Sequence, residues 1–400
     1  MKSRAEASTR AVRAAIESDT QHGAVVPPLH LSSNFAFAGF GEKREYDYTR
    51  SGNPTRDALA AALTELEAGK GAVVTSSGMA ALNLVCQLLE PGDLLVAPHD
   101  CYGGTYRLFE NLAAKGHFQV EFVDQTNPAA LSAACERGPR IILVETPSNP
   151  LLRIVDIAEV AALARKSGAL LAVDNTFLSP ALQQPITLGA DLVIHSTTKY
   201  LNGHSDVVGG AVVAATQELA EKLTWWANCL GITGAPFDSY LTLRGVRTLH
   251  ARMRQHEETA NVLANLLQDH PGVSRVYYPG LARHPGHSIA ARQQSGFGGM
   301  MSFDINGGAQ AVRAFVEALT FFSLAESLGG VESLVCHPAS MTHAPVAADA
   351  LENAGINQNL VRLSIGLESA EDLVADVLGA LDAARHAQLT APVEKVAALA

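Results

Sequence analysis

The sequence lacks several features that define other classes of protein. Its longest apolar stretch runs from Val207 to Ala215, contains two glycines, and is far shorter than the roughly 20 residues of a membrane helix. Its five cysteines form no C-x-x-C pair of the kind that binds zinc or cycles between redox states. These absences predict a cytoplasmic protein with reduced thiols, no membrane anchor and no metal site.

Clusters of positive charge are also missing. Acidic residues outnumber basic ones by 40 to 29, and no run of Lys or Arg could follow a phosphate backbone. Charged residues make up 17% of the chain and hydrophobic residues 48%, which is the balance of an ordinary globular protein. Nucleic acid is therefore a poor candidate partner.

Apolar runs dominate the middle of the chain. Between about residues 71 and 215, runs such as GAVVTSS, LLVAPH, RIILVETP and LLAVDN alternate with helical patterns. The runs are continuous rather than alternating in polarity, which is typical of strands buried on both faces. The pattern predicts an α/β fold with a mostly parallel central sheet between two layers of helices.

The flanking segments have different patterns. The segment before the alternating block is rich in Gly, Pro and aromatic residues, whereas the pieces after about residue 257 indicate a smaller α+β domain. We expect an N-terminal arm over residues 1–55, an α/β domain over residues 56–257 and a C-terminal α+β domain over residues 258–400.

A lysine follows one of the predicted strands. In HSTTKY, Lys199 lies just past the apolar run DLVIHS, in the region where parallel sheets bind ligands. Its amine can form an imine with an aldehyde cofactor, and the hydroxyls of Ser196 and Thr198 can bind a phosphate. An isolated lysine in a Ser/Thr-rich turn is more often a surface residue, so this motif alone leaves both interpretations open.

Three other residues follow neighbouring predicted strands. Asp174 ends LLAVD and can pair with a protonated ring nitrogen, while Gly78 in TSSGMA stands at a strand-to-helix turn that can hold an anion. Tyr102 can stack on a flat ring. A turn or a helix cap is the structural alternative for the aspartate, and a simple bend for the glycine. Convergence of these residues with Lys199 favours a pyridoxal-phosphate site, and no dinucleotide, nucleophile-elbow or zinc motif competes.

From about Ser8 to His386 the chain resembles the cystathionine γ-synthase branch of the Cys/Met-metabolism pyridoxal-phosphate family, which has fold type I. The motifs that carry this resemblance include YDYTRSGNPTRDAL, APHDCYGGTYRLFE, VDNTFLSPALQQP, HSTTKYLNGHSDVVGG and VRLSIGLE. The resemblance implies that Lys199 is the Schiff-base lysine of pyridoxal 5′-phosphate, with Asp174 at the pyridinium nitrogen and Tyr102 stacked on the ring. The implied phosphate ligands are Gly78, Met79, Ser196 and Thr198, joined by Tyr48 and Arg50 of a neighbouring chain.

The resemblance also implies an amino-acid substrate and a homotetramer whose active sites are shared across a dimer interface. Arg362 matches the arginine that binds the substrate α-carboxylate, assisted by Ser327 and Asn149. The candidates for binding the distal carboxylate and the incoming cysteine are Arg107, Asp47 and Glu326. A strand-edge charge is the alternative for the arginine of VRLSIGLE, and surface or structural charges are the alternatives for these last three residues.

The implied reaction is a γ-replacement. O-Succinyl-L-homoserine, or another O-acylhomoserine, would react with L-cysteine to give L-cystathionine and succinate, a step of transsulfuration in methionine biosynthesis. A cystathionine γ- or β-lyase and an O-acylhomoserine sulfhydrylase are the alternatives within the family. The synthase is favoured because APHDCYGGTYRLFE and WWANCLGITGAPFDSY resemble synthases over their whole length. A non-enzymatic cofactor-binding protein ranks last, because Lys199 and Asp174 are both present.

Overall fold

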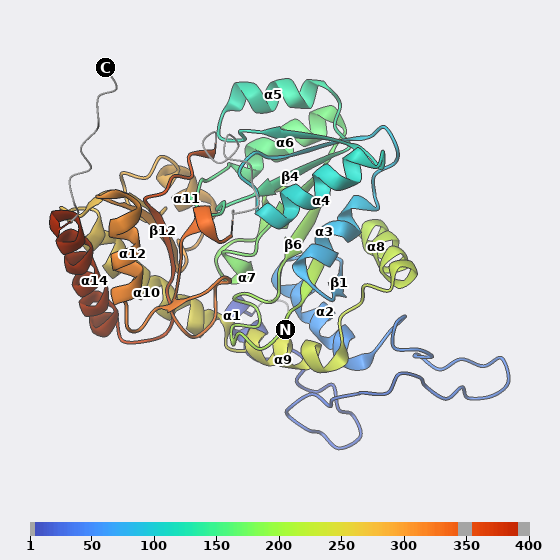
Figure 1. The fold of residues 1–400 in the computed structure, drawn as a ribbon. Coiled ribbons are helices and arrows are strands. Elements are labelled where there is room, and N and C mark those ends of the chain that lie inside the picture. The colour runs from blue at the N-terminus through green and yellow to red at the C-terminus, as the bar shows by residue number, and fades with distance from the viewer. Residues whose placement is uncertain (1–4, 343–353, 391–400) are drawn as a thin grey trace.

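The computed structural model describes residues 5–342 and 354–390, which form two parts with one β-sheet each (Figure 1). The larger sheet consists of β1 (Gly71–Thr75), β2 (Leu94–Pro98), β3 (Gln119–Val123), β4 (Ile141–Glu145), β5 (Leu170–Asp174), β6 (Leu192–His195) and β7 (Gly210–Ala214). Its order is β1-β7-β6-β5-β4-β2-β3. The strands from β3 to β6 pair in parallel, and β7 lies antiparallel between β6 and β1. The predicted α/β fold with a mostly parallel sheet is confirmed.

Helices cover both faces of the larger sheet. The helices of this part are α1 (Ala7–Val12), α2 (Pro54–Leu66), α3 (Gly78–Cys86), α4 (Gly103–Ala114), α5 (Pro128–Glu136), α6 (Ile157–Ser167), α7 (Ser179–Leu182), the 3-10 helix η2 (Pro185–Leu188), α8 (Gln217–Leu230) and α9 (Pro236–Val246). α3, α4 and α8 pack on one face through Leu84, Phe109 and Leu223, and α5 and α6 pack on the opposite face. Every residue of β2, β4 and β7 is buried as a result, which explains their continuous apolar runs.

The second part is smaller. Its sheet has the order β10-β11-β12-β9-β8, formed by β8 (Val273–Tyr277), β9 (Met300–Ile305), β10 (Ser323–Leu324), β11 (Leu334–Cys336) and β12 (Leu360–Ser364). The accompanying helices are α10 (Leu249–Leu267), α11 (His287–Gln293), α12 (Gly308–Ala318), the 3-10 helix η3 (Pro338–Ser340) and α14 (Ala370–Thr390). α12 and α14 pack on this sheet in a core that includes Phe303 and Phe315. Within the described ranges, no helix is long and apolar enough to cross a membrane.

Helix α10 joins the two parts. Leu249 and Met253 in its first half are buried in the same core as α2 and α9, whereas Leu263 and Leu267 in its second half are buried in the core of the smaller sheet. The predicted domain boundary after residue 257 falls inside this helix. The division at residues 55 and 257 stays a prediction, and residues 1–4, 343–353 and 391–400 of the predicted segments lie outside the described residues.

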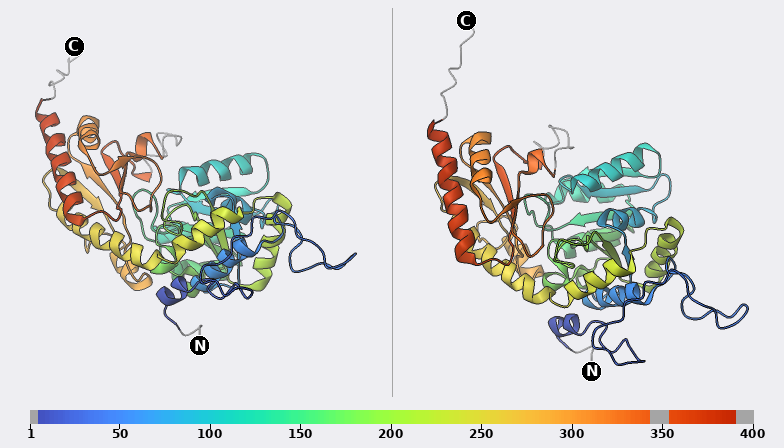
Figure 2. Two further views of the ribbon diagram at one scale, coloured as in Figure 1. Left: turned by 90° about the horizontal axis from the view of Figure 1, so that it is seen from below. Right: turned by 60° about the horizontal axis from the view of Figure 1, so that its bottom comes forward.

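The segment before α2 projects from the body of the molecule (Figure 2). Two isolated bridges, between Asn34 and Tyr48 and between Gly39 and Glu42, tie its stretches together. Its apolar side chains are unusually accessible: Val25 and Leu31 are each 65% exposed, and Phe40 is fully exposed. A role for this arm in contacting a neighbouring chain stays a prediction.

The topology brings particular turns together. β2, β4, β5 and β6 are parallel, so their carboxyl ends lie at one edge of the sheet. Tyr102, Glu145, Asp174 and Lys199 lie at or shortly after the ends of these strands. The sheet therefore gathers at one edge residues that are up to about a hundred positions apart in the sequence.

Two helical glycines provide a test of the packing. A Cβ at Gly245 in α9 would lie 2.1 Å from the backbone oxygen of Asn202, whereas a Cβ at Gly379 in α14 would meet nothing within 4 Å. Gly-to-Ala exchange in an open helix position stabilises by about 1 kcal/mol, but overpacking costs about 1–3 kcal/mol or more. We expect Gly245→Ala to lower the melting temperature and Gly379→Ala to keep or raise it. Equal effects of the two substitutions in a thermal melt would contradict this packing.

Candidate active site

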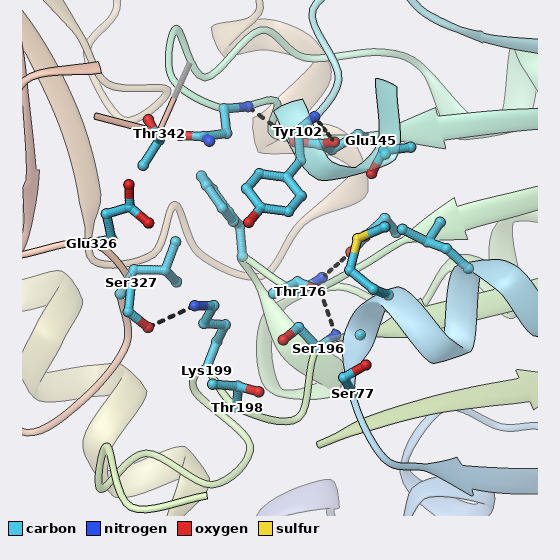
Figure 3. A pocket seen from close by; sticks show the side chains of 18 of the residues that line it. Ser77, Tyr102, Glu145, Thr176, Ser196, Thr198, Lys199, Glu326, Ser327 and Thr342 are labelled. Carbon is cyan, nitrogen blue, oxygen red and sulfur yellow. Dashed lines mark hydrogen bonds between the residues drawn. The ribbon is translucent and has the colours of Figure 1, made fainter. Parts of the chain in front are cut away.

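A cavity of about 410 Å³ lies at the carboxyl edge of the larger sheet, beside the loops of the second part (Figure 3). Eleven of the predicted site residues line it: Gly78, Met79, Tyr102, Asn149, Asp174, Ser196, Thr198, Lys199, Glu326, Ser327 and Arg362. These residues come from both parts of the fold. The cavity is therefore the candidate active site.

One wall of the cavity is built like an anion cradle. α3 begins there, and the Ser77 hydroxyl caps it by accepting a hydrogen bond from the Ala80 N–H at 3.0 Å. A Cβ on Gly78 would approach the Cβ of Ser196 to 2.8 Å, so only glycine lets the helix start this close to the end of β6. A helix N-terminus has free N–H groups and a partial positive charge, which suits a phosphate.

Two hydroxyl groups fix the turns that follow β5 and β6. The Oγ1 of Thr176 accepts a hydrogen bond from the Ser196 N–H at 2.9 Å, and the Oγ1 of Thr198 accepts one from the Gly209 N–H at 3.0 Å. The turn that precedes Lys199 is therefore held in place from two sides.

Asp174 ends β5 at the base of the cavity. Its carboxylate accepts a hydrogen bond from the Thr176 N–H at 3.0 Å. Burial raises the pKa of Asp174, while Thr176 and His195 oppose that rise. A carboxylate in such a place gains most from a partner that brings a positive charge, such as a protonated ring nitrogen.

Lys199 lines the cavity, and its amine points toward Ser327 (Figure 3). Its Nζ donates a hydrogen bond to the Oγ of Ser327 at 2.6 Å. Burial, and then the positive charge of Arg362, lower the pKa of Lys199 to about 8, while Glu326 opposes this shift. The amine is therefore neutral in a useful fraction of molecules near neutral pH, and a neutral amine is the reactive form.

Arg362 reaches the cavity from β12. Its guanidinium donates to the Oδ1 of Asn149 at 2.7 Å and to the carbonyl oxygen of Ser327 at 2.8 Å. It is only 3% exposed, and within residues 5–342 and 354–390 its buried Nε has no hydrogen-bond partner. Ser327 has a φ of +90°, a value that residues other than glycine rarely adopt. Its backbone is therefore strained at a position beside the amine of Lys199 and the guanidinium of Arg362. A planar guanidinium with a free donor suits a carboxylate ligand.

Tyr102 forms another wall. Its ring is 42% exposed, and a Cβ on Gly104 would lie 2.5 Å from the ring, so this glycine leaves room for it. The Tyr102 N–H donates to the Oε2 of Glu145 at 3.1 Å. The ring is therefore available for stacking while its backbone is anchored.

Four predicted site residues do not line the cavity of their own chain. Arg107 is exposed on α4, and Asp47 forms an ion pair with Lys43 in the arm. Tyr48 is also exposed in the arm, and Arg50 donates to the Asn228 carbonyl on α8 at 2.7 Å. The roles assigned to these residues stay predictions.

Sequence reasoning missed several residues that line the cavity, among them Ser77, Glu145, Thr176, Phe177 and Thr342. Ser77 could have been found as the cap before Gly78. A charged residue that ends an apolar strand, as in IILVE, marks Glu145 in the same way as Asp174. Phe177 and Thr342 carry no comparable signal in the sequence.

Residues 8–382 match the family model described as Cys/Met metabolism PLP-dependent enzyme. The chain belongs to this family. Pyridoxal phosphate is accordingly its cofactor, and the cavity suits that group. It combines a glycine cradle at a helix N-terminus, a buried carboxylate without a cationic partner in the described residues, and a lysine of lowered pKa.

Individual relatives are similar over nearly the whole chain. The cystathionine γ-synthase of Escherichia coli strain K12 is 57% identical over 371 residues, which is 92% of this chain and 96% of the relative. The solved cystathionine γ-synthase of Xanthomonas oryzae pv. oryzae is 62% identical, with a TM-score of 0.95 and coverage of 96% and 99%. A cystathionine β-lyase of Lactococcus lactis subsp. cremoris strain MG1363 is 46% identical over 374 residues, or 94% and 98% of the two chains.

The lowered pKa of Lys199 predicts how the rate at which this PLP-dependent enzyme regains its cofactor depends on pH. Because only the neutral amine attacks the aldehyde, the rate of covalent capture by the apoenzyme should rise with pH and level off above about pH 8. The rate for a lysine derivative whose α-amino group is blocked, measured in parallel, should level off only above its usual pKa of about 10.4. Stopped-flow absorbance at several pH values measures both rates, and a protein curve that matches the free lysine would contradict the lowered pKa.

Proposed function

We propose that this enzyme catalyses γ-replacement, joining O-succinyl-L-homoserine or another O-acylhomoserine to L-cysteine to give L-cystathionine and the free acid. The observation that carries this proposal is the identity to two γ-synthases, 57% and 62%, against 46% to the β-lyase over a similar span. The cavity supports it with groups suited to an amino-acid substrate. The site supports the class of substrate, and the similarity supports the choice of reaction.

We assign the cofactor site to residues of the cavity. Gly78, Met79, Ser196 and Thr198 bind the phosphate, together with Tyr48 and Arg50 of a neighbouring chain. When bound, pyridoxal phosphate supplies an electron sink that stabilises negative charge next to the substrate amine. Asp174 would maintain that capacity by pairing with the ring nitrogen, and Tyr102 would help to hold the ring.

Lys199 is the proposed general base and acid. Its amine lies within hydrogen-bond reach of Ser327, and its lowered pKa lets it both accept and return a proton near neutral pH. It would remove the proton from the substrate Cα, give that proton up, and then remove one from Cβ, so that the bond from Cγ to the acyloxy oxygen can break and the free acid can leave. It would return protons to Cβ and Cα after the thiolate of cysteine has bonded to Cγ. Tyr102, which lines the same cavity, would assist these transfers.

Arg362 binds the substrate α-carboxylate in this proposal. Asn149 and Ser327 hold its guanidinium, and its free Nε offers a further donor. The contacts fix the direction from which the substrate meets Lys199. Glu326 lines the same cavity, where it can orient the amine of the incoming cysteine.

The remaining assignments concern the entrance and the assembly. We propose that Arg107 binds the distal carboxylate of the succinyl group and that Asp47 contributes to the cysteine site. These residues, with Tyr48 and Arg50, lie outside the cavity of their own chain and require a neighbouring subunit. The proposal therefore includes a homotetramer of paired dimers in the cytoplasm.

Cystathionine cleavage by a γ- or β-lyase is the second candidate. The similarity to a lyase at 46% identity over 94% of the chain favours it, and Lys199, Asp174 and Arg362 would serve either reaction. Sulfhydrylation of the acylhomoserine is a further variant that uses the same residues with a smaller nucleophile. These reactions differ in what enters the cavity rather than in its basic residues.

A paired assay distinguishes the candidates. Cofactor-loaded protein is incubated with O-succinylhomoserine plus cysteine or sulfide in separate tubes, and with cystathionine alone in another, and products are identified by mass. We expect cystathionine formation to be at least tenfold faster than cleavage. Faster release of keto acid and thiol from cystathionine would assign the enzyme to the lyases, and a preference for sulfide would assign it to the sulfhydrylases.

A further inference from the structure

We propose that Glu145 is a positioning residue that holds the ring of Tyr102 and the guanidinium of Arg362 in one fixed arrangement. This inference rests on the proposed cofactor site and deepens it. None of the roles assigned above to binding or proton transfer uses Glu145, although it lines the cavity.

The two oxygens of Glu145 bind two different walls of the cavity. Glu145 ends β4 and is 8% exposed. Its Oε2 accepts a hydrogen bond from the Tyr102 N–H at 3.1 Å, and its Oε1 accepts one from the Asn149 N–H at 3.2 Å. The single carboxyl group thus fixes the distance between Tyr102, which precedes α4, and Asn149, which lies in the loop after β4.

The contact between Glu145 and Asn149 also affects Arg362, which is proposed to bind the substrate α-carboxylate. The side chain of Asn149 accepts a hydrogen bond from Arg362 at 2.7 Å, and both residues are almost fully buried. A shift of the Asn149 backbone would therefore move the Oδ1 that orients the guanidinium. Glu145 acts on Arg362 through one intermediate residue, so its expected effect is on geometry.

The surroundings of Glu145 disfavour a negative charge on it. Burial, and then the nearby carboxylate of Asp174, raise the pKa of Glu145 well above its usual range, while the two backbone donors oppose that rise. The two carboxyl groups stand on paired residues of β4 and β5. Replacement of the carboxyl by an amide of the same shape removes one of the two acceptors.

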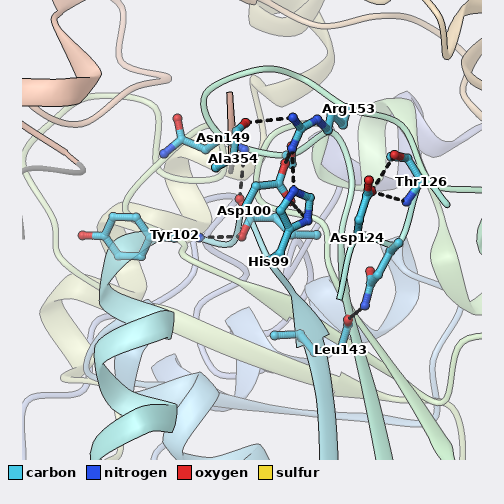
Figure 4. A network of polar contacts seen from close by, with 12 residues as sticks. His99, Asp100, Tyr102, Asp124, Thr126, Leu143, Asn149, Arg153 and Ala354 are labelled. Atoms are coloured by element: carbon cyan, nitrogen blue, oxygen red, sulfur yellow. Dashed lines mark hydrogen bonds and ion pairs between the residues drawn. The ribbon is translucent and has the colours of Figure 1, made fainter. Parts of the chain in front are cut away.

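A neighbouring carboxylate provides a matched control. Asp100 is 7% exposed and accepts hydrogen bonds from Ser148 at 2.7 Å and from Arg153 at 3.0 Å (Figure 4). It lies two positions before Tyr102 and contacts the residue before Asn149. Within the described residues, its hydrogen bonds reach neither of the two backbone groups that Glu145 holds, so Asp100→Asn disturbs the same region without releasing them.

The experiment compares two probes on the holoenzyme. L-Alanine carries the α-carboxylate that Arg362 binds, whereas ethylamine lacks it, and the change in cofactor absorbance gives a dissociation constant for each. The ratio of the two constants measures the contribution of the carboxylate contact. Because neither probe has a leaving group, the ratio does not depend on which reaction the enzyme catalyses.

We expect Glu145→Gln to reduce this preference for alanine about tenfold, as loss of orientation in a charged hydrogen bond does. Asp100→Asn should change the ratio less than about twofold, even though it breaks a buried ion pair and lowers the melting temperature. An unchanged ratio in Glu145→Gln, or an equal loss in Asp100→Asn, would overturn the inference. Failure of the unaltered protein to respond to either amine would instead contradict the cofactor site itself.

A second comparison tests the route through Asn149. If Glu145 acts through this residue, Glu145→Gln added to Asn149→Ala should reduce the ratio less than about twofold further, because coupled residues are not additive. A full additional tenfold loss would contradict the proposed route. Glu145→Asp, which keeps the carboxyl group but is too short to meet both donors, replaces the Gln variant if that variant does not fold, and the same loss is expected.

Discussion

The site depends on one geometric constraint, which is that parallel strands end at the same edge of their sheet. β2, β4, β5 and β6 each end there, and the turns that follow them are the parts of the chain free to bind a ligand. Continuous burial of β2 and β4 keeps this edge in place. The smaller sheet then completes the cavity by supplying Arg362 from β12, which closes the site over the edge.

The charges in the cavity are separated in a way that fits a single elongated ligand. Asp174 and Glu145 place carboxyl groups at the base, the N-terminus of α3 favours an anion at one side, and Arg362 and Lys199 form a cationic group at the other. These groups are largely shielded from solvent, so the electrostatic interactions between them are stronger than they would be in water. The same burial lowers the pKa of Lys199 to about 8, which places its amine near the range that proton transfer at neutral pH needs, and it raises the pKa of Asp174.

The sequence predicted the parts of this arrangement that follow from local patterns. The parallel sheet, the residues after its strands and the glycine turn at Gly78 are local signals, and the family resemblance added Arg362. The contact of Lys199 with Ser327 joins residues 128 positions apart, and the strained backbone of Ser327 depends on the folded surroundings, so neither could be predicted. Glu145 was missed because its importance comes from two backbone groups that only the fold brings to it.

The proposed chemistry requires that the cavity holds pyridoxal phosphate through Lys199. Reduction of the cofactor-loaded protein with borohydride, which makes the bond between the aldehyde and the lysine permanent, followed by peptide mapping by mass spectrometry, tests this attachment. We expect a pyridoxyl group on Lys199, and we expect both this group and the cofactor absorbance to be lost in Lys199→Ala. Stoichiometric labelling of a different lysine, or retained absorbance in that variant, would show that Lys199 does not hold the cofactor.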